Sequence, residues 1–161
     1  MKKLCILLAL LLPAFVLCAC VDKPQTQQLS ALSVPDLQPD QAAVIVKEGE
    51  TFLVCTVTLG RDTDASNGEQ LLQYLSDEGI LSVTWQQSDY GKYLLSVGGA
   101  VADESKNQFI AIYTSVEKDK GAWAGVPSYE ADGVKLVSAA VGISQLTVEG
   151  GAVLYFEVSS Y

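Results

Sequence analysis

The chain of 161 residues contains no histidine, and this absence excludes several kinds of chemistry. Histidine is the base of Ser-His-Asp triads and the commonest metal ligand in proteins. Basic residues are also few: ten Lys and Arg stand against nineteen Asp and Glu, for a formal net charge of −9. A nucleic-acid-binding protein needs a basic surface to neutralise phosphates, so nucleic acid is excluded as a partner.

Cysteine is scarce as well, and three of the four cysteines lie in the first twenty residues. Lys2 and Lys3 precede an apolar run over residues 4–20, which is shorter than the roughly 20 residues of a membrane-spanning helix and is typical of a secretory signal peptide. The run ends in "LCAC", which resembles a bacterial lipobox. The resemblance implies that residues 1–19 are a lipoprotein signal peptide and that Cys20 is lipidated. The protein would then be attached to the cell membrane on its extracytoplasmic face, since two acyl chains give a stable anchor. The alternative is an ordinary secretory signal with incidental cysteines.

The fourth cysteine, Cys55, is the only thiol left outside this segment, so the exported domain has no internal disulfide. It lies in "TFLVCTVTL" with the same parity as Leu53, Val57 and Leu59. This pattern predicts a small buried side chain rather than a reactive thiol.

The rest of the chain divides into a polar segment and one folded domain. Residues 20–41 are rich in Gln, Pro, Ser and Asp and are predicted to be a flexible tether after the lipidated cysteine. The domain is expected over residues 42–161, with 49% hydrophobic residues in the whole chain to supply a core. Apolar and alternating runs predict strands at 43–47, 51–59, 81–87, 92–97, 109–115, 134–139 and 152–158, with a turn at 89–91.

One helix is predicted over about residues 67–78. Ser66 and Glu69 have the spacing of a capping box. Leu71, Leu72 and Leu75 then form an apolar stripe, and Gly79 suits the left-handed residue after a helix. A sheet with one principal helix packed on one face is an α+β domain.

Four stretches resemble the transcobalamin-like C-terminal domain, a domain of unknown function that is common in bacterial surface lipoproteins. They are "GEQLLQYL", "YGKYLLSVGG", "NQFIAIYTS" and "GISQLTVEGGAVLYF", and the similarity covers about Thr51 to Tyr161. The chain departs from the family's pattern at Gly98-Gly99, where Asn-Gly is usual, and at Gly151, where Asp is common. The resemblance implies a β-grasp-like fold and, more distantly, cobalamin binding.

Aromatic residues at strand ends and in loops are the candidates for ligand binding, because exposed rings can stack on a corrin face or a sugar. They are Trp123, Tyr129, Tyr90, Tyr93 and Tyr113. Trp123 lies in the middle of a long loop between small residues, and long loops in compact domains are often functional. The alternative is that these rings cover the open side of the sheet or fix the loop. Trp85 shares its parity with Leu81 and Val83 and is expected in the core.

Metal binding and catalysis have little support in the sequence. "DTDASNGE" over residues 62–69 imitates a calcium loop, but its glycine is one position late and Gln73 stands where a bidentate Glu is needed. No serine nucleophile motif is present, and no carboxylate pair can be placed in a cleft. We therefore expect no metal, no cofactor and no enzymatic activity.

The sequence favours a membrane-anchored protein that captures a small molecule, with a corrinoid or a glycan as ligand. The alternative is a cell-surface adhesion or protein-interaction domain that joins an envelope protein partner through an exposed sheet edge.

Overall fold

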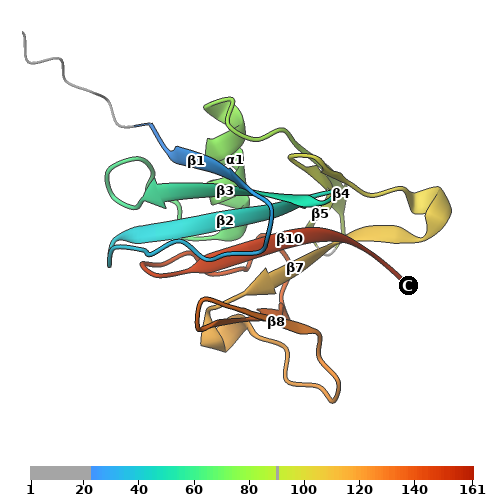
Figure 1. The fold of residues 1–161 in the computed structure, drawn as a ribbon. Helices are drawn as coiled ribbons and strands as arrows, with labels where there is room; N and C mark the ends of the chain where they lie inside the picture. Colours follow the sequence, from blue (N-terminus) through green and yellow to red (C-terminus); the bar gives the residue numbers. More distant parts are fainter. Residues whose placement is uncertain (1–22, 90) are drawn as a thin grey trace, which may run out of the picture.

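Two sheets and one principal helix make up the part of the chain that the computed structural model describes, residues 23–89 and 91–161 (Figure 1). The larger sheet has seven strands in the order β1-β3-β2-β10-β7-β9-β8, and the smaller has three in the order β4-β5-β6. The strands are β1 (Gln25–Leu29), β2 (Gln41–Glu48), β3 (Thr51–Thr58), β4 (Val83–Ser88), β5 (Gly91–Val97), β6 (Ala100–Val101), β7 (Gln108–Thr114), β8 (Ser128–Ala131), β9 (Val134–Ser138) and β10 (Val153–Ser160). Short 3₁₀ helices lie at Glu104–Lys106 and Glu117–Asp119.

The centre of the large sheet is a parallel pair. β2 and β3 form the predicted antiparallel hairpin around Gly49, and β10 then lies beside β2 in the same direction, with Tyr155 opposite Ile45. Residues 42–46 of β2 are all buried. A continuous apolar run is typical of a strand covered on both faces, which is the position of β2 here.

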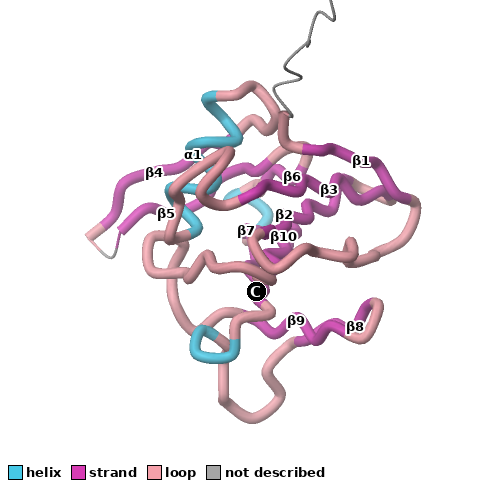
Figure 2. The backbone as a smooth tube through the Cα atoms, turned by 90° about the vertical axis from the view of Figure 1, so that its left-hand side faces the viewer, coloured by secondary structure: helices cyan, strands magenta, loops and turns pink. Residues whose placement is uncertain are grey.

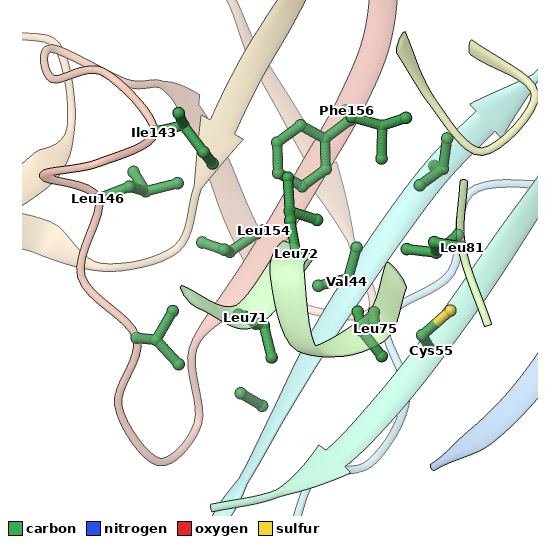
Figure 3. Close-up of a cluster of buried hydrophobic side chains, with 14 of the residues drawn as sticks. Val44, Cys55, Leu71, Leu72, Leu75, Leu81, Ile143, Leu146, Leu154 and Phe156 are labelled. Atoms are coloured by element: carbon green, nitrogen blue, oxygen red, sulfur yellow. The ribbon is translucent and has the colours of Figure 1, made fainter. Parts of the chain in front are cut away.

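The helix α1 (Gly68–Asp77) covers one face of this sheet. Leu71, Leu72 and Leu75 pack against Val44 and Phe156, and Cys55 is buried in the same cluster (Figure 3). The predicted helix, its apolar stripe and the buried position of Cys55 are confirmed. Burial raises the pKa of the Cys55 thiol to about 12, with a contribution from nearby Glu48, so this thiol is inert at neutral pH.

The predicted cap of this helix is wrong by one residue. Asn67 is the N-cap, and its side chain accepts the Gln70 amide proton at 3.0 Å. The Gln70 side chain in turn accepts the Ser66 amide proton at 2.9 Å. Asn caps a helix as well as Ser does, so the sequence offered two adjacent start positions with equal local preference. Glu69 therefore takes no part in capping the helix, and its side chain is available to contact other segments.

The second face of the sheet is covered in part by residues 30–40, and the prediction of a flexible tether to residue 41 is wrong. Five residues of β1 pair with β3, from Gln25 opposite Thr56 to Leu29 opposite Phe52. Residues 30–40 then cross the sheet, where Val34 is buried beside Ile45 and Tyr155. Asp132, in the β8–β9 turn, accepts hydrogen bonds from the Ser33 hydroxyl at 2.7 Å and the Val34 amide at 2.8 Å. The polar composition of the segment reflects its exposed outer side.

The small sheet and the β8–β9 hairpin project from different sides of the molecule, as the side view in Figure 2 shows. Leu81, Leu94, Val97 and Ala100 tie the small sheet to the helix-side core. The strands β1, β6 and β8 were not predicted, because they are short or polar. The observed class, mostly sheet with one principal helix among the described residues, agrees with the α+β prediction.

Candidate functional site

The most unusual group on the second face of the large sheet is a carboxylate buried among tyrosines. Glu157, on β10, is only 6% exposed. The Tyr129 hydroxyl donates to Glu157 Oε1 at 2.7 Å, and the Tyr155 hydroxyl donates to Oε2 at 2.9 Å. The Lys47 Nζ atom lies 3.7 Å from Oε2. A buried carboxylate is tolerated only when hydrogen bonds and an opposite charge compensate it, and both are present here.

Three tyrosine rings form one cluster around this carboxylate, which we call the tyrosine cluster: Tyr113, Tyr129 and Tyr155. Tyr113 and Tyr155 are directly opposite each other on β7 and β10, with ring centroids 5.4 Å apart. Tyr129 reaches in from β8 and meets both rings edge to face, at 5.1 Å and 5.3 Å. Tyr113 and Tyr155 are buried, whereas Tyr129 is 37% exposed. Tyr129 is therefore the ring of the cluster that is most open to a ligand.

The electrostatics of the cluster keep its hydroxyls protonated. Burial is the largest cause that raises the pKa of Tyr155, and hydrogen bonding to the Glu157 carboxylate raises it further. Burial and the Glu157 charge raise the pKa of Tyr113 in the same way, and the pKa of Tyr129 is raised by burial and by its bond to Glu157. All three hydroxyls are therefore neutral hydrogen-bond donors at any physiological pH.

The aromatic surface continues along β7 beyond the cluster. Phe109 and Tyr113 share one face of β7, four residues or about 13 Å apart, with the small Ala111 between them opposite Glu157. Phe109 packs against Tyr161 with centroids 4.7 Å apart. Tyr93 lies next to Tyr161. Burial is the main cause that raises the pKa of Tyr93, and its interaction with Tyr161 raises this pKa further. We call this row, from the tyrosine cluster through Phe109 and Tyr161 to Tyr93, the aromatic band.

Trp123 lies apart from the tyrosine cluster, in the loop before β8. It is 49% exposed, and its ring lies against Gly121, where a Cβ atom would be 2.1 Å from a ring carbon. The Val126 amide donates to the Trp123 carbonyl at 3.2 Å, and Gly125 has a φ of +75°, which a tight turn with glycine at this position requires. The loop therefore leaves Trp123 half exposed, and it leads into β8, which is the edge strand of the large sheet opposite to β1 (Figure 1).

The structure thus brings together some of the predicted ligand-binding residues and separates others. Tyr113 and Tyr129 share the tyrosine cluster, and Tyr93 joins the far end of the aromatic band. Within residues 23–89 and 91–161, none of the ring pairs joins Trp123 to these tyrosines. Tyr90 lies outside the described residues, as do Cys20 and the predicted signal peptide.

Glu157 and Tyr155, the two residues at the centre of the site, were not predicted from the sequence. Both lie in "AVLYFEV", where apolar residues occupy both faces of the strand. A glutamate inside such a run has to find donors within the protein, and this was the available signal.

Metal ligands are not gathered in the part of the chain that the structure describes: no group of three or more Cys, Asp or Glu side chains there could hold an ion. Asp62, in the calcium-like segment, instead accepts the Thr58 amide proton at 2.7 Å and bonds Arg61. Among residues 23–89 and 91–161, no helix is long and apolar enough to span a bilayer.

These features define a small β-rich domain with a tyrosine-ringed carboxylate, and two solved structures are similar to it. A protein from Ruminococcus gnavus ATCC 29149, described as a "putative metal binding protein", matches with a TM-score of 0.52 at 20% identity, over 76% of this chain and 98% of its own. Haptocorrin in complex with Cbi matches with a TM-score of 0.48 at 14% identity, over 80% of this chain and 27% of the haptocorrin chain. No protein-family model matches the sequence. No curated protein matches it either.

Proposed function

We propose that the protein is a lipid-anchored, extracytoplasmic binding protein that captures a small molecule at the tyrosine cluster and does not catalyse a reaction. The observation that carries the proposal is Glu157, held by two tyrosine hydroxyls beside the exposed ring of Tyr129. Small-molecule sites combine aromatic surface with a few fixed polar groups that orient the ligand. The chain has no histidine to serve as a general base, which favours binding over turnover.

The ligand that suits this site has a flat apolar face and hydrogen-bond donors at its rim. The face would stack on Tyr129 and the adjoining aromatic band, while the donors would share the Glu157 carboxylate. A corrinoid has both features, and the sequence resemblance to the transcobalamin-like domain points the same way. The Ruminococcus gnavus protein is described in terms of metal binding, but a metal site here would need ligands that the described residues do not bring together.

We also propose that the domain is β-grasp-like and transcobalamin-like. The central order β3-β2-β10-β7, with β2 and β10 parallel and a helix after the first hairpin, supports a β-grasp-like, transcobalamin-like domain.

Equilibrium dialysis with a panel of corrinoids and oligosaccharides tests the ligand. We expect saturable binding of at least one corrinoid, weakened at least tenfold by Tyr129→Ala. Tyr129→Phe is the matched control, because it keeps the ring and removes only the bond to Glu157. Absence of binding across the panel, or equal binding by the Tyr129→Ala variant, would rule out this site.

The anchor has its own test. Cys20→Ala should release the protein from membranes into the culture medium, since it removes the thiol that carries the lipid. Retention of this variant on membranes would show that another feature holds the protein there.

The outer face of the small sheet favours a second candidate function, a protein-interaction domain. Tyr93 and Val101 are exposed there, Val101 at 62%, and Leu95, on the same strand as Tyr93, is half-buried. An antiparallel sheet with one solvated face normally carries polar residues on that face. Cross-linking on intact cells through a photoreactive residue at position 101 would give a protein adduct if this function is correct.

A further inference from the structure

We propose a second binding site, for an uncharged hydroxyl-rich ring such as a hexose, in the hollow between the β4–β5 hairpin and residues 142–145. The hollow has a volume of about 440 Å³. This is within the range of about 300–1,000 Å³ that small-molecule sites occupy. It lies apart from the tyrosine cluster and does not depend on the function proposed there. Its lining residues are Asp89, Gly91, Lys92, Gly142, Ile143, Ser144 and Gln145.

Three segments far apart in the sequence are fixed to one another at the wall of this hollow. The Lys92 Nζ atom lies 2.8 Å from Glu69 Oε1 and 4.0 Å from the centre of the Trp85 ring. The Ser144 hydroxyl donates to Glu69 Oε2 at 2.5 Å. Lys92 is therefore held in one position before any ligand arrives, which reduces the entropy that binding would cost.

Residues 142–146, which form one side of the hollow, are held against the start of α1. The Gly68 and Glu69 amides at the start of α1 donate to the carbonyls of Leu146 and Ile143, at 2.8 Å and 3.1 Å. A Cβ atom on Gly68 would lie 2.6 Å from the Ile143 side chain, so the helix and the loop are in direct contact. The Gln145 and Leu146 amides both donate to the Gly142 carbonyl, which closes the loop into a turn.

Two of the residues that line the hollow, on opposite sides of it, are glycines and contribute no side chain. Gly91 has a φ of +105°, and a Cβ atom there would lie 3.6 Å from Ser144 Oγ. A Cβ atom on Gly142 would meet no atom within 4 Å, so this position borders open space. A ligand can therefore approach the backbone closely, as glycine commonly permits at binding sites.

The polar groups of the hollow suit a neutral polyol. The Lys92 ammonium has three N–H donors and Glu69 takes one of them, while Ser144 keeps its lone pairs as acceptors. Gln145 supplies both a donor and an acceptor, and Asp89 supplies acceptors. The charges of Glu69 and Lys92 cancel, so the negative charge of Asp89 is the net charge of these three side chains. An anion would therefore be repelled from the hollow. Closely spaced donors and acceptors without a positive excess match the hydroxyl groups of a sugar ring.

Nuclear magnetic resonance titration of the ¹⁵N-labelled protein tests the site. The probes are the methyl glycosides of glucose, galactose and mannose at millimolar concentration. We expect at least one probe to shift the amide signals of Gly91, Lys92 and residues 142–145 with saturation. Tyr129→Ala should leave this titration unchanged, which separates the site from the tyrosine cluster.

Two variants decide whether the hollow is responsible. Gly142 lines the hollow, and a Cβ atom there would meet no atom within 4 Å, so Gly142→Leu adds a large side chain beside the hollow without a clash. This variant should keep the wild-type spectrum elsewhere and abolish saturation. Lys92→Met keeps an unbranched side chain of similar length, removes the ammonium donors and should weaken binding at least fivefold. The proposal is overturned if no probe gives saturable shifts, if Gly142→Leu binds as the wild type does, or if methylammonium chloride saturates the site and the sugars do not.

Discussion

Tyr129 and Tyr155 meet edge to face, with planes at 89°, and their hydroxyls donate to different oxygens of the same carboxylate. The two residues are 26 positions apart in the sequence numbering and come from strands that are not neighbours in the sheet. Glu157 thus couples the β8 edge of the sheet to its centre. A ligand that binds to Tyr129 would change the hydrogen bond between Tyr129 and Glu157.

The raised pKa values of the tyrosine cluster predict a loss of stability in alkali. In the unfolded chain the tyrosines ionise near pH 10, whereas the folded protein keeps Tyr113, Tyr129 and Tyr155 protonated above that pH. Stability is therefore fully present below about pH 10 and falls as the pH rises further, because the unfolded state binds fewer protons there. Urea unfolding between pH 8 and 12, with tyrosinate absorbance, measures this; normal titration of all seven tyrosines in the folded protein would contradict it.

Glu157→Gln should lower the free energy of unfolding by about 1–3 kcal/mol. The substitution replaces two charge-assisted hydrogen bonds with weaker ones and turns an amide N–H₂ group toward a tyrosine hydroxyl. Urea denaturation at pH 7 gives the value. Glu149→Gln, at an exposed site, is the control and should change stability by less than about 0.5 kcal/mol.

Asn67→Ala should cost about 1 kcal/mol of stability, because Asn67 is the residue whose side chain caps α1. Ser66→Ala should cost less, since the Ser66 amide keeps its bond to Gln70 in that variant. Thermal unfolding of the two variants side by side distinguishes the caps. The reverse order would favour the Ser66–Glu69 capping box that the sequence suggested.

Removal of β1 should destabilise the domain. A chain that begins at Ser30 loses the five β1–β3 pairs and the packing of Leu29 on the second-face core. We expect a loss of about 2 kcal/mol or more, which lowers the melting temperature by roughly 5 °C relative to a chain that begins at Lys23. Equal melting temperatures would restore the description of this segment as a tether.

Gly150→Ala should destabilise the protein much more than Gly142→Ala does. A Cβ atom at Gly150 would lie 1.9 Å from the Pro39 carbonyl oxygen, so the backbone of residues 39–40 has to move. Such overpacking costs about 1–3 kcal/mol or more. Gly142 has free space and an ordinary backbone conformation, so its alanine variant should melt close to the wild type. Chemical denaturation compares the two.

The local pattern of the chain determined several elements. Alternation and apolar runs located the β2–β3 hairpin, and a leucine stripe located α1, because these signals depend only on which residues lie within a few positions of each other. The same parity argument placed Cys55 in the core and Tyr113 on one face with Phe109 and Ala111. Local signals were insufficient where two neighbours had equal preference, as at Ser66 and Asn67.

Tertiary structure alone decided the rest. No short-range signal shows that β10 lies parallel to β2, or that the polar strand β1 completes the sheet against β3, because these pairings join residues far apart in the chain. The site depends on the same pairings. Tyr129, Tyr155 and Glu157 lie on β8 and β10, and only the order of the strands brings the hydroxyls to the carboxylate that burial forces to find donors.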